Sequence, residues 1–287
     1  MHILLIAAAC LILVMAGVML YDSNRFHKVT YEITSDHIEK DFRFVFLSDL
    51  HNKKYGPGNE KLLAAIDACH PEAVFIGGDI LTAVPGKSVE PAAKFICTLA
   101  QRYLIYYANG NHEQRLGLYP ETYADMGERY ESLLQEEGVS RLVNEAEYNA
   151  EHGVEVVGCQ IDRRYYKRFK RVRMDNDYLE EILPEKKEGK YTILLAHNPD
   201  YFNAYKAWGA DLTLSGHVHG GVMRLPVLGG VLGTNFRFFP KYDGGLFKED
   251  GKVMIVSRGL GAHTIPLRIF NPAELVEVII RKETKEA

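Results

Sequence analysis

The stretch F-R-F-V-F-L-S-D-L-H, residues 42–51, places an apolar run directly before an aspartate and a histidine. A continuous apolar run of this length, bounded by polar residues, is typical of a buried β-strand. Runs of the same kind, each followed by Asp, Asn or His, occur at residues 73–76, 104–107, 192–195 and 212–214. Because functional groups of open α/β sheets gather beyond the carboxyl ends of the strands, we expect these polar side chains to meet at one edge.

Weaker patterns outline the rest of the chain. Apolar residues at helical spacing predict helices at residues 60–68, 91–101 and 121–137, the last of them ended by Gly138. Further short apolar or alternating runs predict strands at residues 28–33, 154–157, 253–256 and 275–280. Paired glycines at residues 229–230 and 244–245 indicate tight bends or hairpins. Helical material comes first and strand-rich material second, so we predict an α/β fold of two packed sheets with helices outside them.

The composition sets broad limits. A chain of 287 residues with 47% hydrophobic content can build one large domain or two small ones. Its net charge of -4 offers no general attraction to nucleic acid. The four cysteines show no C-x-x-C spacing, and Cys10 lies in an apolar run. The other three are an odd number, which favours buried free thiols over a disulfide framework.

Residues 3–20 form an apolar segment without a single charge. Its length of about 18 residues just meets what a membrane crossing needs. A cleaved signal peptide would carry a basic start and a shorter apolar stretch. We therefore interpret the segment as a retained single-pass anchor in the cell membrane, with a signal peptide and a buried core helix as alternatives. Arg25 and Lys28 follow it and no Lys or Arg precedes it, which favours the cytoplasmic side for the rest of the chain.

Two histidines in S-G-H-V-H-G-G, His217 and His219, form the most informative single motif. Imidazoles at positions i and i+2 between glycines are seldom used for packing, so this motif indicates metal binding. Asp49 and His51 also stand at i and i+2. On a strand such residues share a face, where they can chelate one ion. Taken alone, an Asp-x-His triplet is a weak signal.

The other polar residues at strand ends have ordinary explanations when each is taken singly. Asp79 follows two glycines and could be a helix N-cap. Asn111, in N-G-N-H-E, could be a turn residue, and His197, in A-H-N-P, could be a satisfied core histidine. Five independent strand ends that each carry a suitable side chain are improbable as coincidence. We therefore predict that these side chains bind metal together.

In order, the blocks D-x-H, G-D, G-N-H-E, H and G-H-x-H resemble the pattern of the calcineurin-like metallophosphoesterases, from about residue 42 to the C-terminus. The resemblance implies a four-layer α-β-β-α sandwich of two mixed sheets, here with an N-terminal transmembrane helix. It divides the chain into a transmembrane anchor at residues 1–21, a juxtamembrane segment with the first strand at residues 22–41, and a metallophosphoesterase domain at residues 42–287.

The resemblance also implies a role for each polar residue at these strand ends. The first metal ion would be held by Asp49, His51, Asp79 and His219. The second would be held by Asp79, Asn111, His197 and His217, so that Asp79 bridges the two ions. His112 is not assigned to a metal. It would be the catalytic residue that donates a proton to the leaving oxygen or stabilises the charge that develops there.

Such a donor set limits the metals and the reaction. Oxygen and nitrogen donors without thiolate suit Mn²⁺, Fe or Zn²⁺, and we expect two divalent ions, with Mn²⁺ ahead of the other two. Two ions about 3.5–4 Å apart can lower the pKa of a bridging water and clamp phosphoryl oxygens for in-line attack. The expected function is a dinuclear metal-dependent phosphoric ester hydrolase. The alternatives are a phosphomonoesterase or nucleotidase with the same site and a non-catalytic binding module.

Residues outside the metal site bear on the substrate. The protein serine/threonine phosphatase branch has G-D-x-x-D-R-G after the bridging aspartate, whereas this chain has Thr82 at the second Asp position and no arginine after it. A phosphoprotein substrate is therefore not expected. The apolar N-terminus, the L-S-D-L-H and A-H-N-P blocks and the tail at residues 257–268 resemble a bacterial membrane-associated branch. That branch includes phosphodiesterases and relatives of UDP-2,3-diacylglucosamine hydrolase, which implies a phosphodiester or pyrophosphate substrate, with lipid-linked compounds among the candidates.

Two further features bear on partners. Seven cations fall within residues 163–173. This segment is either solvated surface or a cap that contacts an anionic substrate or anionic headgroups, and nucleic acid is not an expected partner. An aromatic cluster should belong to the core or, where exposed, line a groove for an acyl chain; it consists of Phe236, Phe238, Phe239 and Tyr242. The expected partners are thus a phosphoester and the membrane, and the sequence predicts no particular oligomeric state.

Overall fold

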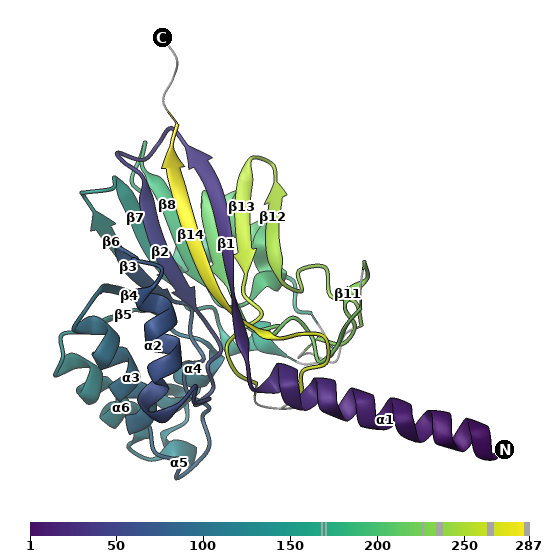
Figure 1. Ribbon diagram of the computed structural model, residues 1–287. Coiled ribbons are helices and arrows are strands. Elements are labelled where there is room, and N and C mark those ends of the chain that lie inside the picture. The colour runs from purple at the N-terminus through teal and green to yellow at the C-terminus, as the bar shows by residue number, and fades with distance from the viewer. Residues whose placement is uncertain (168, 170, 226, 234–237, 263–266, 284–287) are drawn as a thin grey trace.

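Two six-stranded sheets pack face to face, and helices cover their outer faces (Figure 1). The computed structural model describes the chain apart from residues 168, 170, 226, 234–237, 263–266 and 284–287. The strands of the first sheet are, in order, β1 (Phe26–Ser35), β14 (Ala273–Lys282), β2 (Phe42–Leu47), β3 (Ala73–Ile76), β4 (Leu104–Ala108) and β5 (Arg141–Leu142). Those of the second are β12 (Gly245–Glu249), β13 (Lys252–Val256), β9 (Leu212–Ser215), β8 (Tyr191–Ala196), β7 (Val154–Cys159) and β6 (Ala146–Asn149).

Both sheets are mixed. In the first, β2 to β5 run parallel, while β14 is antiparallel to β2 and parallel to β1. In the second, β13, β9, β8 and β7 run parallel, with β12 and β6 antiparallel at the edges. The parallel strands send their carboxyl ends, and the turns that follow them, to a common edge.

Side-chain alternation explains the four layers. Along β2, Phe42, Phe44 and Phe46 pack between the two sheets, while Val45 and Leu47 point the other way into the core under the helices. Successive strand residues face opposite sides, so a strand that is apolar at every position must be covered on both faces. The predicted α-β-β-α sandwich of two mixed sheets is confirmed.

The outer helices agree with the sequence except at one break. On the first sheet lie α2 (Glu60–Asp67), α3 (Glu90–Ala100), α4 (Asn111–Leu118), α5 (Pro120–Tyr123) and α6 (Met126–Gln135). On the second lie α7 (Tyr178–Ile182) and α8 (Phe202–Trp208). Short 3₁₀ turns occupy η1 (Pro57–Asn59), η2 (Arg163–Tyr166) and η3 (Pro199–Tyr201).

The single helix predicted for residues 121–137 is wrong. Ala124 takes a left-handed conformation (φ 50°) and separates α5 from α6. Just after this break α6 passes close to the end of α4, because a Cβ added at Gly127 would lie 2.9 Å from the carbonyl oxygen of Leu116. A helical pattern in the sequence does not show where another helix crosses it.

The apolar segment forms α1 (His2–Ser23), which projects from the body of the molecule (Figure 1). It is long and apolar enough to cross a membrane, with a mean hydropathy of 3.0, and none of its apolar window is buried. Side chains such as Ile3 and Leu13 are exposed. The alternative of a buried core helix is therefore wrong.

Candidate metal centre

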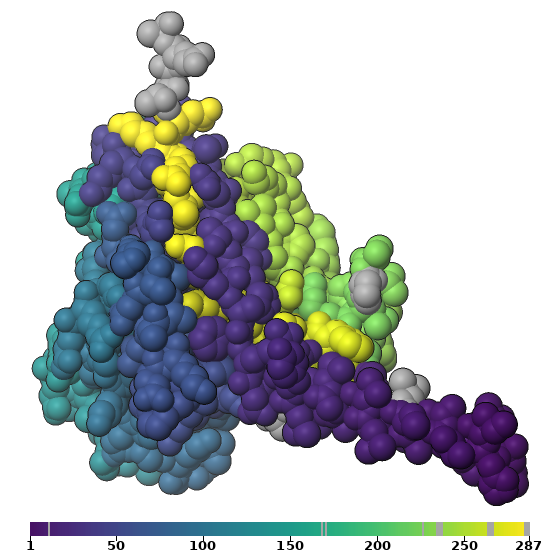
Figure 2. Space-filling model, viewed as in Figure 1, coloured from purple at the N-terminus to yellow at the C-terminus, as the bar shows by residue number. Residues whose placement is uncertain are grey.

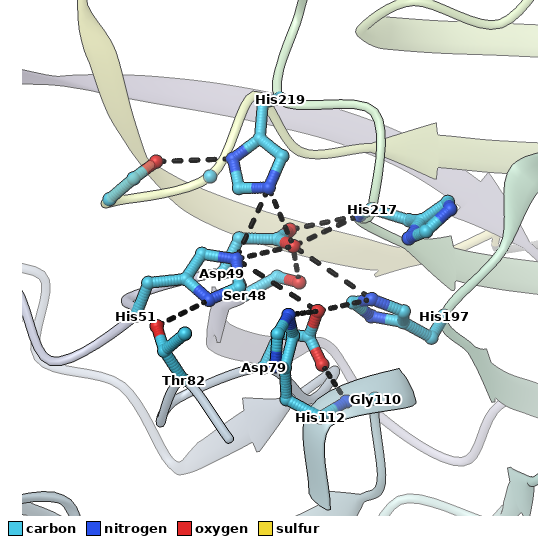
Figure 3. A network of polar contacts seen from close by, with 12 residues as sticks. Ser48, Asp49, His51, Asp79, Thr82, Gly110, His112, His197, His217 and His219 are labelled. Atoms are coloured by element: carbon cyan, nitrogen blue, oxygen red, sulfur yellow. Dashed lines mark hydrogen bonds and ion pairs between the residues drawn. The ribbon is translucent and has the colours of Figure 1, made fainter. Parts of the chain in front are cut away.

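The turns after five strands meet at one edge of the molecule, and Figure 3 shows their side chains converging. The converging side chains are Asp49 and His51 after β2, Asp79 after β3, His112 after β4, His197 after β8, and His217 and His219 after β9. Asn111 begins α4, immediately before His112. All of them are buried. Residues as far apart in the sequence as Asp49 and His219 are thus brought into one small volume.

Asp49 and His51 do not lie on a strand, so the argument from strand alternation is wrong. β2 ends at Leu47, and the backbone then becomes left-handed at Asp49 (φ 54°) and at His51 (φ 50°). Their N–H groups donate to the carbonyl oxygens of Gly78 and Asp79, both at 3.0 Å. Bonds to the neighbouring turn, rather than strand geometry, place Asp49 Oδ1 3.7 Å from His51 Nε2.

Left-handed backbone recurs at the other predicted ligands. Asp79, His217 and His219 have φ values of 55°, 69° and 53°. Each such residue costs on the order of 1–3 kcal/mol and persists only where its surroundings fix it. Here the fixing bonds are between turns: the His217 N–H donates to the Asp49 carboxylate at 3.0 Å, and the His112 N–H donates to Asp79 Oδ1 at 2.7 Å. The backbone therefore stores strain to hold these side chains in position.

One group of donor atoms consists of Asp49, His51 and His219, whose atoms all lie within 4.8 Å of one another. Nε2 of His219 is 3.4 Å from Asp49 Oδ1 and 3.2 Å from Nε2 of His51. The same atom, His51 Nε2, lies 3.9 Å from Asp79 Oδ2. The Asp79 carboxylate thus borders this group.

A second group consists of Asp79, His197 and His217, again within 4.8 Å of one another. Oδ2 of Asp79, the atom that borders the first group, is 3.2 Å from His197 Nε2. Asn111 Oδ1 and His197 Nε2 are buried and have no hydrogen-bond partner among the described residues. Asp79 lies between the two groups, as the bridging position requires.

Backbone carbonyls fix the histidine rings. Nδ1 of His197 lies 2.7 Å from the carbonyl oxygen of Gly77, and Nδ1 of His219 lies 3.1 Å from that of Gly261. A carbonyl oxygen only accepts, so each Nδ1 must donate. A neutral ring then presents the lone pair of Nε2 to the carboxylates, which is how metal-binding histidines are oriented in proteins.

The charges at the site favour the binding of cations. Burial raises the pKa of Asp79, but the neighbouring His197 and His112 more than offset it and hold that pKa well below its usual value. Conversely, burial lowers the pKa of His197, but the Asp79 carboxylate raises it to about 9. Among the described residues, the ion pairs of Asp49 and Asp79 are all with histidines. Two buried carboxylates facing imidazole nitrogens, with no thiolate, fit a pair of divalent cations.

His112 lies within 4.8 Å of donor atoms of both His51 and Asp79, with its Nε2 4.0 Å from Asp79 Oδ2. Its Nδ1 accepts the backbone N–H of Ala83 at 3.0 Å, so a neutral His112 carries its proton on Nε2. Thr82 contacts Nδ1 of His51 at 3.3 Å. The backbone of Ala83 therefore orients His112, while the Thr82 side chain serves His51.

Glu113 has a structural role that the sequence reasoning missed. Its buried carboxylate accepts the backbone N–H groups of Asp79 and Ile80 at 2.8 Å and of Gly110 at 3.0 Å. These bonds join the turns after β3 and β4. The signal was present, because Glu at the third position of a helix typically reaches back to the cap. Only the structure shows that it also holds the turn of the bridging carboxylate.

The basic segment begins against this site. The ring of Tyr166 lies 5.2 Å from that of His217, and the guanidinium of Arg163 lies 5.4 Å from the Tyr166 ring. Arg163 also donates to the carbonyl oxygen of Asn111 at 3.2 Å. Farther along, Arg171 packs on the ring of Tyr201; residues 168 and 170 lie outside the described part. Arg163 and Tyr166 are thus the members of the segment that border the site.

The aromatic cluster divides. Tyr242 is buried and packs against Phe202 and Phe247, whereas Phe238 and Phe239 are exposed. The fourth predicted member, Phe236, lies outside the described residues. The core interpretation therefore holds for Tyr242 and is wrong for Phe238 and Phe239.

Known proteins resemble this chain in sequence. The family described as Calcineurin-like phosphoesterase matches residues 42–221. "Uncharacterized protein YpbG" of Bacillus subtilis is 26% identical over 229 residues, covering 78% of this chain and 75% of that protein. An "Uncharacterized metallophosphoesterase" of Helicobacter pylori strain J99 is 28% identical over 252 residues, covering 84% of this chain and 60% of that protein. "Phosphodiesterase YaeI" of Escherichia coli is 24% identical over 193 residues, covering 66% and 64%. The chain thus spans less than two thirds of the last two relatives.

Proposed function

Because the chain belongs to the family described as Calcineurin-like phosphoesterase, we propose that it is a two-metal phosphodiesterase or pyrophosphatase. One observation carries this proposal. Two groups of buried Asp and His donors, each within 4.8 Å, meet at Asp79, whose carboxylate belongs to the second group and lies 3.9 Å from His51 of the first. This arrangement is what a pair of ions with a shared ligand requires, and such pairs catalyse in-line displacement at phosphorus.

The proposed ligands follow the two groups. The first ion takes Asp49, His51, Asp79 and His219, and the second takes Asp79, Asn111, His197 and His217. We propose Mn²⁺ for both, and the nitrogen and oxygen donors also suit Fe or Zn²⁺. When bound, the ions supply Lewis acidity toward phosphoryl oxygens and lower the pKa of water.

The chain's own residues supply the proton chemistry and the positioning. His112 holds its proton on Nε2, at the edge of the site, where it can donate to the leaving oxygen. The carbonyls of Gly77 and Gly261 keep two imidazoles in the orientation that a ligand needs. Arg163 borders the same edge as Asn111 and offers a cation to an anionic substrate group.

The substrate and location are further parts of the proposal. A diester preference is supported by the relative that bears the name phosphodiesterase. A membrane location is supported by α1, and the cations that follow it, Arg25 and Lys28, favour a catalytic domain on the cytoplasmic side. Substrates carried by lipids are then within reach.

The test is hydrolysis of bis(p-nitrophenyl) phosphate by the full chain with added Mn²⁺. Asp79→Asn and His217→Ala should each lower kcat/KM on the order of 100-fold or more, since a lost metal ligand removes several kcal/mol of charge stabilisation. Asp67→Asn and His37→Ala, which alter exposed groups elsewhere, should leave activity unchanged. Wild-type activity in both site variants would refute the mechanism.

Two measurements separate the alternatives. Comparing p-nitrophenyl phosphate with the diester distinguishes a phosphomonoesterase from a phosphodiesterase with the same site. Metal analysis of the purified chain distinguishes either enzyme from a binding module, because a module without catalysis should hold well under one ion per chain.

A further inference from the structure

We propose that a small apolar lobe beside α1 rests in the headgroup layer of a lipid bilayer, so that the metal centre opens at the membrane surface. The lobe is built on β10 (Arg224–Leu225) and β11 (Gly229–Gly230), which pair as a hairpin. It also includes Phe238 and Phe239, whose backbone pairs with residues 231 and 232 just after β11. Residues 269–271 belong to it as well, because Ile269 pairs with the backbone of residues 222–224. We call this the hairpin lobe.

Exposed apolar side chains concentrate in the hairpin lobe. After α1, the described part of the chain exposes eleven large hydrophobic side chains, and six belong to the lobe. Those six are Leu225, Val227, Leu228, Phe238, Phe239 and Phe270. Leu228 is 62% exposed and Phe238 71% exposed. Isolated exposed apolar residues are ordinary, but a group of this kind on one small element marks a surface that contacts another apolar phase.

The lobe is tied directly to the membrane-spanning candidate. Near the end of α1, the buried carboxylate of Asp22 accepts the backbone N–H of Asn271 at 3.2 Å. The neighbouring Ile269 donates to the carbonyl of Val222 at 3.2 Å and accepts the N–H of Arg224 at 3.1 Å. A continuous set of hydrogen bonds thus leads from α1 to the hairpin.

The remaining part of the lobe follows the same connections. Val231 donates to the carbonyl of Met223 at 2.9 Å, and Phe239 donates to the carbonyl of Val231 at 3.1 Å. In Figure 1 the hairpin projects from the body on the same side as α1, and Figure 2 shows the green lobe alongside the purple helix. If α1 crosses a bilayer, the lobe is carried to the surface of that bilayer.

The charges of the lobe suit an apolar environment. Arg224 is its single charged residue among those described, and it is satisfied internally: its guanidinium lies 3.1 Å from the Asp243 carboxylate and donates to the carbonyl of Gly220 at 3.2 Å. Two cations, Arg171 and Lys241, line a hollow with Phe238 and Phe239, and cations at the border of an apolar surface suit the anionic headgroup layer. Amphipathic surface elements of this kind settle about 5–10 Å into the boundary between headgroups and acyl chains.

The hairpin lobe is attached to the turn of the metal centre that carries His217 and His219, which we call the histidine turn. Nδ2 of Asn271 donates to the carbonyl oxygens of His219 and Gly221, at 2.8 and 2.6 Å. Asn271 thus holds this turn with its side chain and is bonded to Asp22 through its backbone. The consequence, which rests on the proposed function, is a substrate class: phosphodiesters or pyrophosphates whose apolar part stays in the bilayer while the phosphorus reaches the ions.

Fluorescence quenching tests the contact without reference to catalysis. The chain has a single tryptophan, Trp208, so Trp208→Phe gives a full-length protein without tryptophan fluorescence. In it, Leu228→Trp and Phe239→Trp place probes on the lobe, and Leu104→Trp places a control at the amino end of β4, away from the metal centre. Each protein is reconstituted into vesicles of phosphatidylethanolamine and phosphatidylglycerol, with or without brominated acyl chains.

Brominated lipid should reduce the emission of both lobe probes by about twofold or more, because a side chain at this depth meets the acyl chains. The Leu104→Trp emission should not change. Lobe probes quenched no more than Leu104→Trp would overturn the proposal, and two probe positions guard against a local folding defect at either one.

A second arm tests the substrate class. The double variant Val227→Asp with Leu228→Asp should hydrolyse bis(p-nitrophenyl) phosphate as the wild type does. On a p-nitrophenyl phosphodiester of a diacylglycerol in the same vesicles it should be about tenfold slower, since charge on the tip opposes insertion. Equal rates of wild type and variant on the lipid would overturn the substrate class. If the wild type hydrolyses neither ester, the proposed function fails, while the quenching result still decides the membrane contact.

Discussion

Replacing Glu113 with glutamine tests how the turn of the bridging carboxylate is held. Oε2 of Glu113 accepts the N–H groups of Asp79 and Gly110, and Oε1 accepts the N–H of Ile80. Glutamine has the same shape but only one oxygen. In its better orientation the amide group faces the Ile80 N–H, so one buried donor loses its acceptor, and the other two bonds lose their charged partner.

The magnitude follows from these three bonds. An unsatisfied buried N–H costs about 1–3 kcal/mol. Two bonds that change from a charged to a neutral acceptor lose about 1 kcal/mol each. Burial and the charge of Asp79 raise the pKa of Glu113, so removing its charge relieves some repulsion and lowers the sum. We expect a net loss of about 2–4 kcal/mol, which corresponds to a fall in Tm on the order of 10 °C.

The assay is thermal unfolding of the metal-free full chain in detergent, followed by titration with Mn²⁺. Besides the lower Tm, Glu113→Gln should bind metal about 10–100-fold more weakly, the usual result of removing an outer hydrogen bond from a ligand. Glu128→Gln, at an exposed position on α6, should match the wild type in both measurements. A Glu113→Gln protein with wild-type Tm and metal affinity would refute the role assigned to this carboxylate.

Three further predictions concern the same centre. Gly216→Ala should abolish metal binding, because its Cβ would lie 2.2 Å from the Asp49 carboxylate, whereas Gly117→Ala, with nothing within 4 Å, should bind normally in the same titration. His112→Gln should slow a diester with an alkyl leaving group by about 10²–10⁴-fold but a p-nitrophenyl ester far less, because only the poor leaving group needs the proton; equal losses would contradict a proton donor. In the metal-free protein the pKa of His197 is raised to about 9 from 6.5. The protonated ring therefore contributes fully to the free energy of unfolding below pH 6.5, and this contribution is lost as the pH rises through 9. Mn²⁺ uptake at pH 7 should therefore release protons, measurable by calorimetry in buffers of different ionisation enthalpy, and identical heats in all buffers would count against it.

Local patterns were sufficient for a large part of the structure. Runs that are apolar at every position, such as residues 44–47, place apolar side chains on both faces of a sheet, so both faces must be covered. The four layers follow from that requirement. The same runs located the strand ends, and the structure brings the Asp, Asn and His side chains of those ends together. Charge and hydropathy likewise marked α1, because an apolar run without charge over residues 3–20 needs no tertiary partner to be recognised.

Other features depend on contacts between distant residues. β14, from the C-terminal end, inserts between β1 and β2, and nothing local in either strand predicts that neighbour. The break at Ala124 lies three residues before α6 meets the end of α4 at Gly127. Asn271 holds the histidine turn through carbonyls more than forty positions away.

The sequence by itself determined which residue types stand at the strand ends and which segments are apolar enough to be buried or to enter a membrane. These properties depend on side-chain chemistry and on spacing along one segment. Only the tertiary structure decided how the donors point, because left-handed backbone at Asp49, His51 and Asp79 is held by hydrogen bonds between separate turns. It also placed the exposed lobe beside α1, since hydrogen bonds join residue 22 to residue 271 and residue 222 to residue 269 only when the chain is folded.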